Sequence, residues 1–211
     1  MMIAPALCRS NFHIPSKRWH AMEEIQNTID IFGRLRKYQY KITIENGMEI
    51  VLRFERERYH HLAGFQHLTD LPDIANPISK HKFYNDLRLG KISVEKIKKS
   101  ERYSEIQERI TFFDKLEEIM TPGEGRIIVE FDKSKTDTVI KAKFHLFRRD
   151  GNPFAGEAVY FTLFIDTEYG DTYYPVTYVV EHSNMYVREQ KFHYCTIERL
   201  LLGGKKALAG V

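Results

Sequence analysis

The last third of the sequence contains five segments rich in β-branched and aromatic residues, and this pattern most constrains the fold. The segments are 126–132, 140–147, 158–166, 172–182 and 191–197. Turn-forming stretches such as "RRDGNP" and "EYGD" separate most of them, so we expect short strands paired mainly antiparallel. The segments 158–166 and 172–182 are apolar on both faces, which predicts central positions in the sheet.

A further hairpin is predicted in "YQYKITIENGMEIVLRF", residues 38–54. A two-residue loop at Asn46-Gly47 would place polar residues opposite apolar ones. A three-residue loop, residues 45–47, pairs Ile44 with Met48 and keeps both apolar sets on one face. Because a one-residue slip moves every side chain to the other face, we predict the three-residue loop with Gly47 at positive φ.

Helices are predicted before and between these strands. Apolar residues recur at spacings of three and four after a possible N-cap at Ser16 and again in residues 106–120, where Pro122-Gly123 ends the pattern. Two shorter helices are expected, one ended by Gly90 and one capped by Ser93. Residues 198–211 read as a short terminal helix and frayed end. The predicted class is therefore α+β, a helical N-terminal half packed on a mainly antiparallel β-sheet, with a tail at 1–15 and one domain at 16–211.

Composition narrows the functional classes. The chain has 211 residues and a net charge of +3, which suits a single domain and permits an anionic partner. Cys8 and Cys195 follow no metal or redox spacing, so we expect reduced thiols and a cytoplasmic location. No apolar segment approaches the roughly 18 residues that a membrane span needs, and we expect no membrane association.

Three histidines lie close together in "YHHLAGFQHL", at His60, His61 and His67. Adjacent residues point to different sides of most backbones, and the spacings match no recognised zinc motif. No Gly-rich phosphate loop, GxSxG motif or acidic cluster is present either, so we expect neither a metal nor a cofactor. Packing, surface exposure and catalysis all remain open for these histidines.

The segment "KAKFHL" predicts a row of cationic groups. Lys141, Lys143 and His145 are spaced two apart, so in a strand they would share one face. Such a row can hold a phosphodiester and stabilise added negative charge, although a solvated sheet face has the same pattern. Tyrosines in "TYYPVTYVVEH" suit either a core or a stacking platform for bases, and Pro175 indicates a strand edge or a bulge.

The order of the motifs "HHLAG", "FYNDLRLGKIS", "SEIQERITFFDKL" and "YYPVTY" resembles the fourth phage-associated family of the barnase–EndoU–colicin–RelE-like nuclease superfamily. The resemblance covers roughly residues 20–200. It implies helices packed on an antiparallel sheet and RNA cleavage without metal, in which a base activates the ribose 2′-hydroxyl and an acid protonates the departing 5′-oxygen.

The resemblance also implies site residues. His61 is expected to act as general base or acid, with Tyr174 and Thr177 as further catalytic candidates. The expected substrate-binding residues are Arg109, Lys141, Lys143 and His145. RNA is the expected partner, and an inhibitor protein is expected for a toxin-like enzyme. The alternative is a non-catalytic interaction module of a mobile element, in which the histidines pack. The position of His61 relative to the other candidates discriminates between the two.

Overall fold

The computed structural model describes residues 17–151, 157–167, 170 and 172–202, with side chains described from residue 24 onward. The helices are α1 (Lys17–Leu35), α2 (Tyr59–Leu62), α3 (Pro72–Ala75), α4 (Lys80–Arg88), α5 (Val94–Lys98), α6 (Ser104–Thr111) and α7 (Asp114–Ile119), with 3-10 turns η1 (Arg56–Arg58), η2 (Phe65–His67) and η3 (Lys133–Lys135). The strands are β1 (Tyr38–Ile44), β2 (Glu49–Arg53), β3 (Gly123–Glu130), β4 (Phe144–Asp150), β5 (Val159–Thr167), β6 (Thr172–Glu181) and β7 (Lys191–Leu201).

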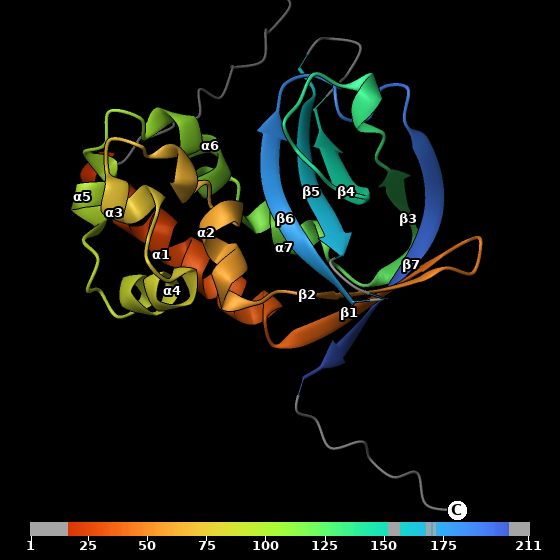
Figure 1. Cartoon of the computed structure of the whole chain (residues 1–211), viewed down its shortest axis with the longest axis horizontal. Coiled ribbons are helices and arrows are strands. Elements are labelled where there is room, and N and C mark those ends of the chain that lie inside the picture. Colours follow the sequence, from red (N-terminus) through yellow and green to blue (C-terminus); the bar gives the residue numbers. More distant parts are fainter. Residues whose placement is uncertain (1–16, 152–156, 168–169, 171, 203–211) are drawn as a thin grey trace, which may run out of the picture.

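The strands form a closed barrel beside a helical half (Figure 1). Their order is β1-β2-β6-β5-β4-β3-β7. All neighbours are antiparallel except β2 and β6, which run parallel and are joined by two residue pairs, Val51 with Thr172 and Leu52 with Tyr173. Beyond Tyr173, β6 runs alongside η1, α2 and α6. The predicted α+β class is confirmed. The helices α2 and α6 meet the barrel along β6, and α7 meets it at β4 and β5.

The first hairpin has the predicted register. Ile42 pairs with Ile50, and Ile44 N donates to Met48 O at 2.9 Å. Gly47 has φ of 86°. The three-residue loop keeps Ile42, Ile44 and Ile50 buried in the main core, which is the physical reason for this register.

The helical half confirms the predicted ends of α4 and α5 and corrects one helix. Gly90, with φ of 70°, follows α4, and Ser93 Oγ accepts from Lys96 N at 3.2 Å at the start of α5. The segment predicted as one helix over 106–120 is divided into α6 and α7, because the backbone leaves helical geometry at Phe112. The residues of its predicted apolar stripe are nevertheless buried: Ile106, Ile110, Phe113, Leu116 and Met120.

Two strand boundaries differ from the sequence prediction. β4 begins at Phe144, so Lys141 and Lys143 precede the regular strand. Residues 198–201 belong to β7 and pair with β1, so the predicted terminal helix is wrong there. The pattern Ile197-Glu198-Arg199-Leu200 fits a helix end and a strand equally well, and pairing with β1 decided it. Residues 203–211 and the predicted tail at 1–15 lie outside the described residues.

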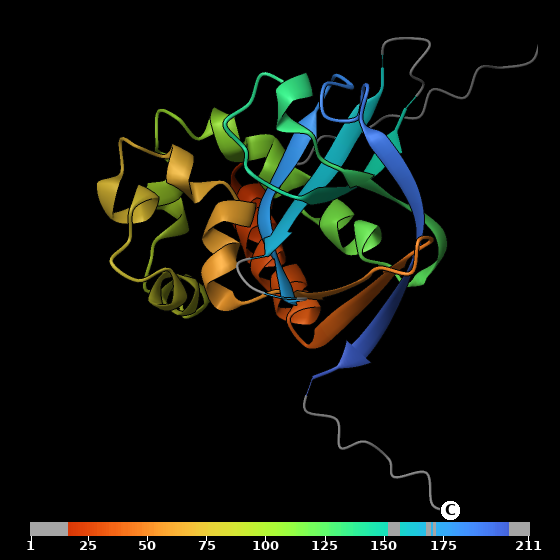
Figure 2. The ribbon, with the colours of Figure 1, turned by 45° about the vertical axis from the view of Figure 1, so that its right-hand side comes forward.

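One continuous core joins the helices to the barrel. It extends from Ile25 and Phe32 on α1 through Phe113 to Leu163 on β5 and Tyr178 on β6. Figure 2 shows α7 beside the strands, where it contacts β4 and β5. The opposite face of β4–β6 carries a smaller core of Phe131, Phe164, Val179 and Tyr186. The strands β5 and β6 therefore bury apolar residues on both faces, as predicted.

Candidate functional site

His60 and His61 lie in the short helix α2, which contacts β6, and their environments differ sharply. His60 is fully buried, its Nε2 donates to Ile74 O at 2.7 Å, and its ring lies edge-on to Phe83. Burial lowers the pKa of His60. His60 is therefore a hydrogen-bonded core residue. This agrees with the expectation that the two neighbours point to different sides.

His61 is half-buried and paired with a lysine. Lys80 is the first residue of α4, and its Nζ lies 2.5 Å from His61 Nε2. Burial and then the charge of Lys80 lower the pKa of His61 to about 4. The ring is therefore neutral at pH 7, and a Nε2 that accepts from Lys80 places the remaining proton on Nδ1. Burial and the nearby Arg58 likewise lower the pKa of Lys80.

Arg58 connects this pair to the start of β6. Its guanidinium carbon lies 3.7 Å from the centre of the Tyr174 ring, which is a close cation–π contact. Tyr174 and Thr177 are both half-buried and flank Pro175. The register between β5 and β6 shifts between Phe164 and Ile165, where Pro175 sits, so the predicted bulge is present. The strand that carries this bulge, β6, also contacts α2.

Strand register places Lys143 on the same sheet face as Tyr174. Tyr174 pairs with Asp166 of β5, and Lys143 N donates to Ile165 O at 3.1 Å. Lys143 is exposed and precedes buried Phe144, so alternation sends its side chain to the face of Asp166 and Tyr174. The backbones of Lys143 and Tyr174 are two strand spacings apart, about 10 Å, with Asp166 between them. Lys141 is exposed further along the same segment. No described hydrogen bond or ion pair joins Lys141 or Lys143 to His61.

Arg109 packs against the glycine of "HHLAG". Gly64 has φ of 84°, and a Cβ there would lie 3.2 Å from Arg109 Cδ and 3.0 Å from Ile106 Cγ2. Only glycine therefore suits both the backbone conformation and the packing at this position. The Arg109 Nη1 has no hydrogen-bond partner among the described residues, and burial lowers its pKa. Arg109 thus presents a half-buried cation on α6 that is electrostatically coupled to Tyr186 and Glu181.

His145 does not join the predicted cationic row. It is fully buried between Phe131 and Phe164, and its Nε2 donates to Tyr186 O at 2.9 Å. Burial lowers its pKa to about 4. The expectation of one exposed face shared with Lys141 and Lys143 was wrong, because segments 131–143 and 182–190 cover the face of β4 that carries His145. A ring in this position offers no surface to a substrate.

The structure places His61, Tyr174, Thr177 and Arg109 on segments that meet at β6. Arg58 acts on His61 and contacts Tyr174, but no described contact joins Arg109 or Thr177 to His61. Lys143 lies just before β4. We refer to His61, Lys80, Arg58, Tyr174 and Arg109 as the junction site. Sequence reasoning missed Lys80 and Arg58. Lys80 follows the helix cap Ser79, but no periodicity relates it to a histidine 19 positions earlier.

Two general features complete the description of the site. Within the described residues, no group of three or more His, Cys, Asp or Glu side chains is placed to hold a metal ion. In the same part of the chain, every helix is too short or too polar to cross a membrane. The expectation that catalysis needs no metal remains a prediction.

Comparison with known proteins supplies the family. Neither the curated proteins nor the solved structures contain a match to this chain. The sequence model of one family, described as phage-Barnase-EndoU-ColicinE5/D-RelE like nuclease4, matches residues 24–199. This range runs from within α1 to within β7 and includes every residue of the junction site. The chain belongs to this phage-associated family of nuclease-like proteins.

Proposed function

We propose that the chain is a metal-independent endoribonuclease whose reaction takes place at the junction site. The ribose 2′-hydroxyl attacks the adjacent phosphorus and loses its proton to His61 Nε2. The bond between 2′-oxygen and phosphorus forms, and the bond from phosphorus to the 5′-oxygen breaks. The products are a 2′,3′-cyclic phosphate and a 5′-hydroxyl.

The observation that carries this proposal is the neutral, partly desolvated imidazole of His61, which contacts Lys80 and lies near Arg58. A general base must be unprotonated at working pH, and a pKa of about 4 meets that requirement. Lys80 occupies Nε2 in the free protein. An entering phosphate attracts Lys80 and so frees Nε2 for the 2′-hydroxyl.

Lys80 is the proposed general acid. It begins beside His61, and its lowered pKa eases donation of a proton to the departing 5′-oxygen. Arg58 and Arg109 supply positive charge for the phosphorane, whose negative charge exceeds that of the phosphodiester. In this proposal Tyr174 and Thr177 contact the ribose or base, and Lys141 and Lys143 bind phosphates. His145 has no role in the reaction.

The first test is cleavage of structured and unstructured RNAs in excess chelator, with analysis of product ends. The expected ends are 2′,3′-cyclic phosphates, and His61→Ala should lower the rate about a hundredfold or more. His193→Ala is the matched control, since His193 lies on β7. Full activity in His61→Ala would remove that residue from the mechanism. Cleavage that needs magnesium and leaves 5′-phosphates would overturn the reaction proposed.

A second test separates the acid from the base. A ribonucleoside 3′-(4-nitrophenyl) phosphate has a leaving group that needs no proton. Lys80→Met should therefore regain much of its lost rate on this substrate, whereas His61→Ala should not. Equal defects of Lys80→Met on both substrates would exclude Lys80 as the acid.

The second candidate function is a non-catalytic interaction module, and the packing roles of His60 and His145 favour it. Failure to cleave any RNA, with or without metal, would support this alternative. The following step would then be a search for protein partners. If RNA is cleaved, expression with and without a neighbouring phage-encoded protein would test the proposed inhibitor.

A further inference from the structure

A strongly basic hollow lies on the helical half, apart from the junction site. It has a volume of about 500 Å³ and lies where the end of α1 meets η1 and the last turn of α4. Its charged lining residues are Asp30, Arg34, Arg36, Lys37, Arg56 and Arg88. Five cations thus face one carboxylate, an imbalance that needs an explanation.

Among the described residues, a close carboxylate pairs with just one of these cations, Arg34. Arg34 donates two hydrogen bonds to Glu117, at 2.9 and 2.8 Å. Lys37 and Arg88 are exposed, and neither forms an ion pair with another described residue. After Arg34 is paired, four cations remain against Asp30. The hollow therefore retains a clear positive charge.

Two of the arginines are held in place by neighbours that leave their charge intact. Arg36 lies over the Tyr84 ring at 5.6 Å, and its Nε has no hydrogen-bond partner in the described part of the chain. Arg56 Nη1 donates to His81 Nε2 at 3.0 Å. Fixed guanidinium groups with unused donors suit an anion that accepts several hydrogen bonds.

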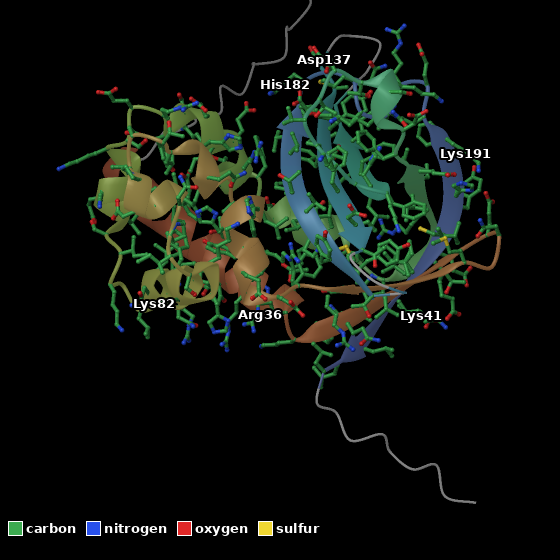
Figure 3. All side chains as sticks on the ribbon, in the orientation of Figure 1. Arg36, Lys41, Lys82, Asp137, His182 and Lys191 are labelled. Carbon is green, nitrogen blue, oxygen red and sulfur yellow. The ribbon has the colours of Figure 1, made fainter. Side chains whose placement is uncertain are left out.

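The helix α4 connects the hollow to the junction site. Lys80, at its start, contacts His61, and Arg88, at its end, lines the hollow. Eight helical steps separate them by about 12 Å, the length of roughly three to four nucleotides in a helical strand. Figure 3 shows Arg36 and Lys82 on the same lower edge of the helical half.

We propose that this hollow binds the phosphate backbone of the RNA substrate, a few nucleotides from the bond cleaved at the junction site. The choice of RNA rests on the proposed function. Phosphates are favoured over an acidic protein surface, because none of the large exposed apolar side chains lines the hollow to pack against a protein. The hollow would add affinity without taking part in the chemistry.

The test is a salt titration of binding to a short fluorescein-labelled single-stranded RNA. The full chain carries His61→Ala, so that the RNA stays intact. Adding Lys37→Glu and Arg88→Glu should weaken binding at low salt at least tenfold and reduce the slope of log K against log salt by about 1.4, the value for two lost phosphates. The control pair is Lys99→Glu with Lys133→Glu, both exposed and outside the hollow. This pair makes the same change in net charge, and it should change the RNA affinity at low salt and the slope of log K against log salt by less than the hollow pair does.

Cleavage by the chain with intact His61 completes the test. Lys37→Glu with Arg88→Glu should raise KM and leave kcat within about twofold, because the removed contacts are equal in ground and transition states. Cleavage and binding that match the control pair would overturn this inference and leave the proposed function standing. If Lys37→Glu with Arg88→Glu weakens RNA binding as expected but the chain with intact His61 cleaves no RNA, the hollow remains a phosphate-binding site and the proposed ribonuclease activity is wrong. Polyglutamate that competes as well as RNA would overturn the assignment to nucleic acid.

Discussion

The pairing of His61 with Lys80 predicts the pH dependence of catalysis. A base is active when unprotonated and an acid when protonated, so kcat/KM should rise as pH rises through about 4, level off, and fall again where Lys80, the proposed acid, loses its proton. The charge of Lys80 is one cause of the low pKa of His61. Lys80→Met should therefore raise that pKa and move the acidic limb to higher pH. An NMR titration of the His61 ring measures the same shift directly, and an unchanged His61 pKa in Lys80→Met would contradict the coupling.

His145 predicts a pH dependence of stability that is separate from catalysis. Its folded pKa, about 4, lies below the ordinary value of 6.5, so the unfolded chain binds the proton more readily. The free energy of unfolding should then fall as pH decreases from about 6.5 to about 4, by roughly 3 kcal/mol at most from this group. Above pH 6.5 this contribution is constant.

The variant that isolates this contribution is His145→Gln, whose amide can still donate to Tyr186 O. Urea unfolding between pH 7 and pH 4 should show a shallower loss of stability than in the parent chain. The control is His182→Gln, since His182 is exposed and bonded to Glu108. A slope in His145→Gln equal to that of the parent would mean that other groups cause the acid sensitivity.

Two glycines separate backbone strain from packing. Both Gly47 and Gly64 have positive φ, but a Cβ on Gly47 meets nothing within 4 Å, whereas one on Gly64 would press on Ile106 and Arg109. Gly47→Ala should lower the free energy of unfolding by about 1 kcal/mol. Gly64→Ala should lower it further and also reduce RNA cleavage, because Arg109 must move. Chemical denaturation measures both, and equal losses would remove the packing argument.

At the scale of elements, the sequence predicted those structures that local patterns determine. Alternation and the Glu45-Asn46-Gly47 loop predicted the register of the first hairpin, and serine caps predicted where α5 begins. The α6–α7 division was not predicted, because Phe112 and Phe113 continue a buried stripe and only the backbone breaks. Hydrophobic periodicity predicts which face of a helix is buried more reliably than it predicts whether the helix is continuous.

Long-range pairing explains most of what the sequence did not predict about the site. The parallel contact of β2 with β6 brings segments more than 100 residues apart together, and no local signal encodes it. Nor does any local signal encode the contact of Lys80 with His61 or the contact of Arg58 with Tyr174. His145 was misplaced for a related reason. Strand alternation predicted on which face of β4 His145 lies, but the segments that cover that face are remote in sequence.

At the scale of the whole molecule, the helical half and the barrel depend on one shared core. Phe113 joins them, with its ring centre 6.2 Å from Tyr59 and 6.0 Å from Tyr178. It is almost completely buried. The junction site lies along the boundary that this core holds together, so its geometry depends on both halves being folded at once.

This shared core predicts that the two halves unfold together. Phe113→Ala should lower the free energy of unfolding by about 3–5 kcal/mol, because it removes a buried ring and leaves a cavity. Helical circular dichroism and hydrogen exchange of β5 amides should then report the same loss, as expected for one cooperative unit. The control is Phe192→Ala, since Phe192 lies on β7 with 46% of its surface exposed and should lose much less. If the β5 amides kept their protection in Phe113→Ala while the helical signal was lost, the barrel would be an independent unit, and the junction site could open without unfolding it.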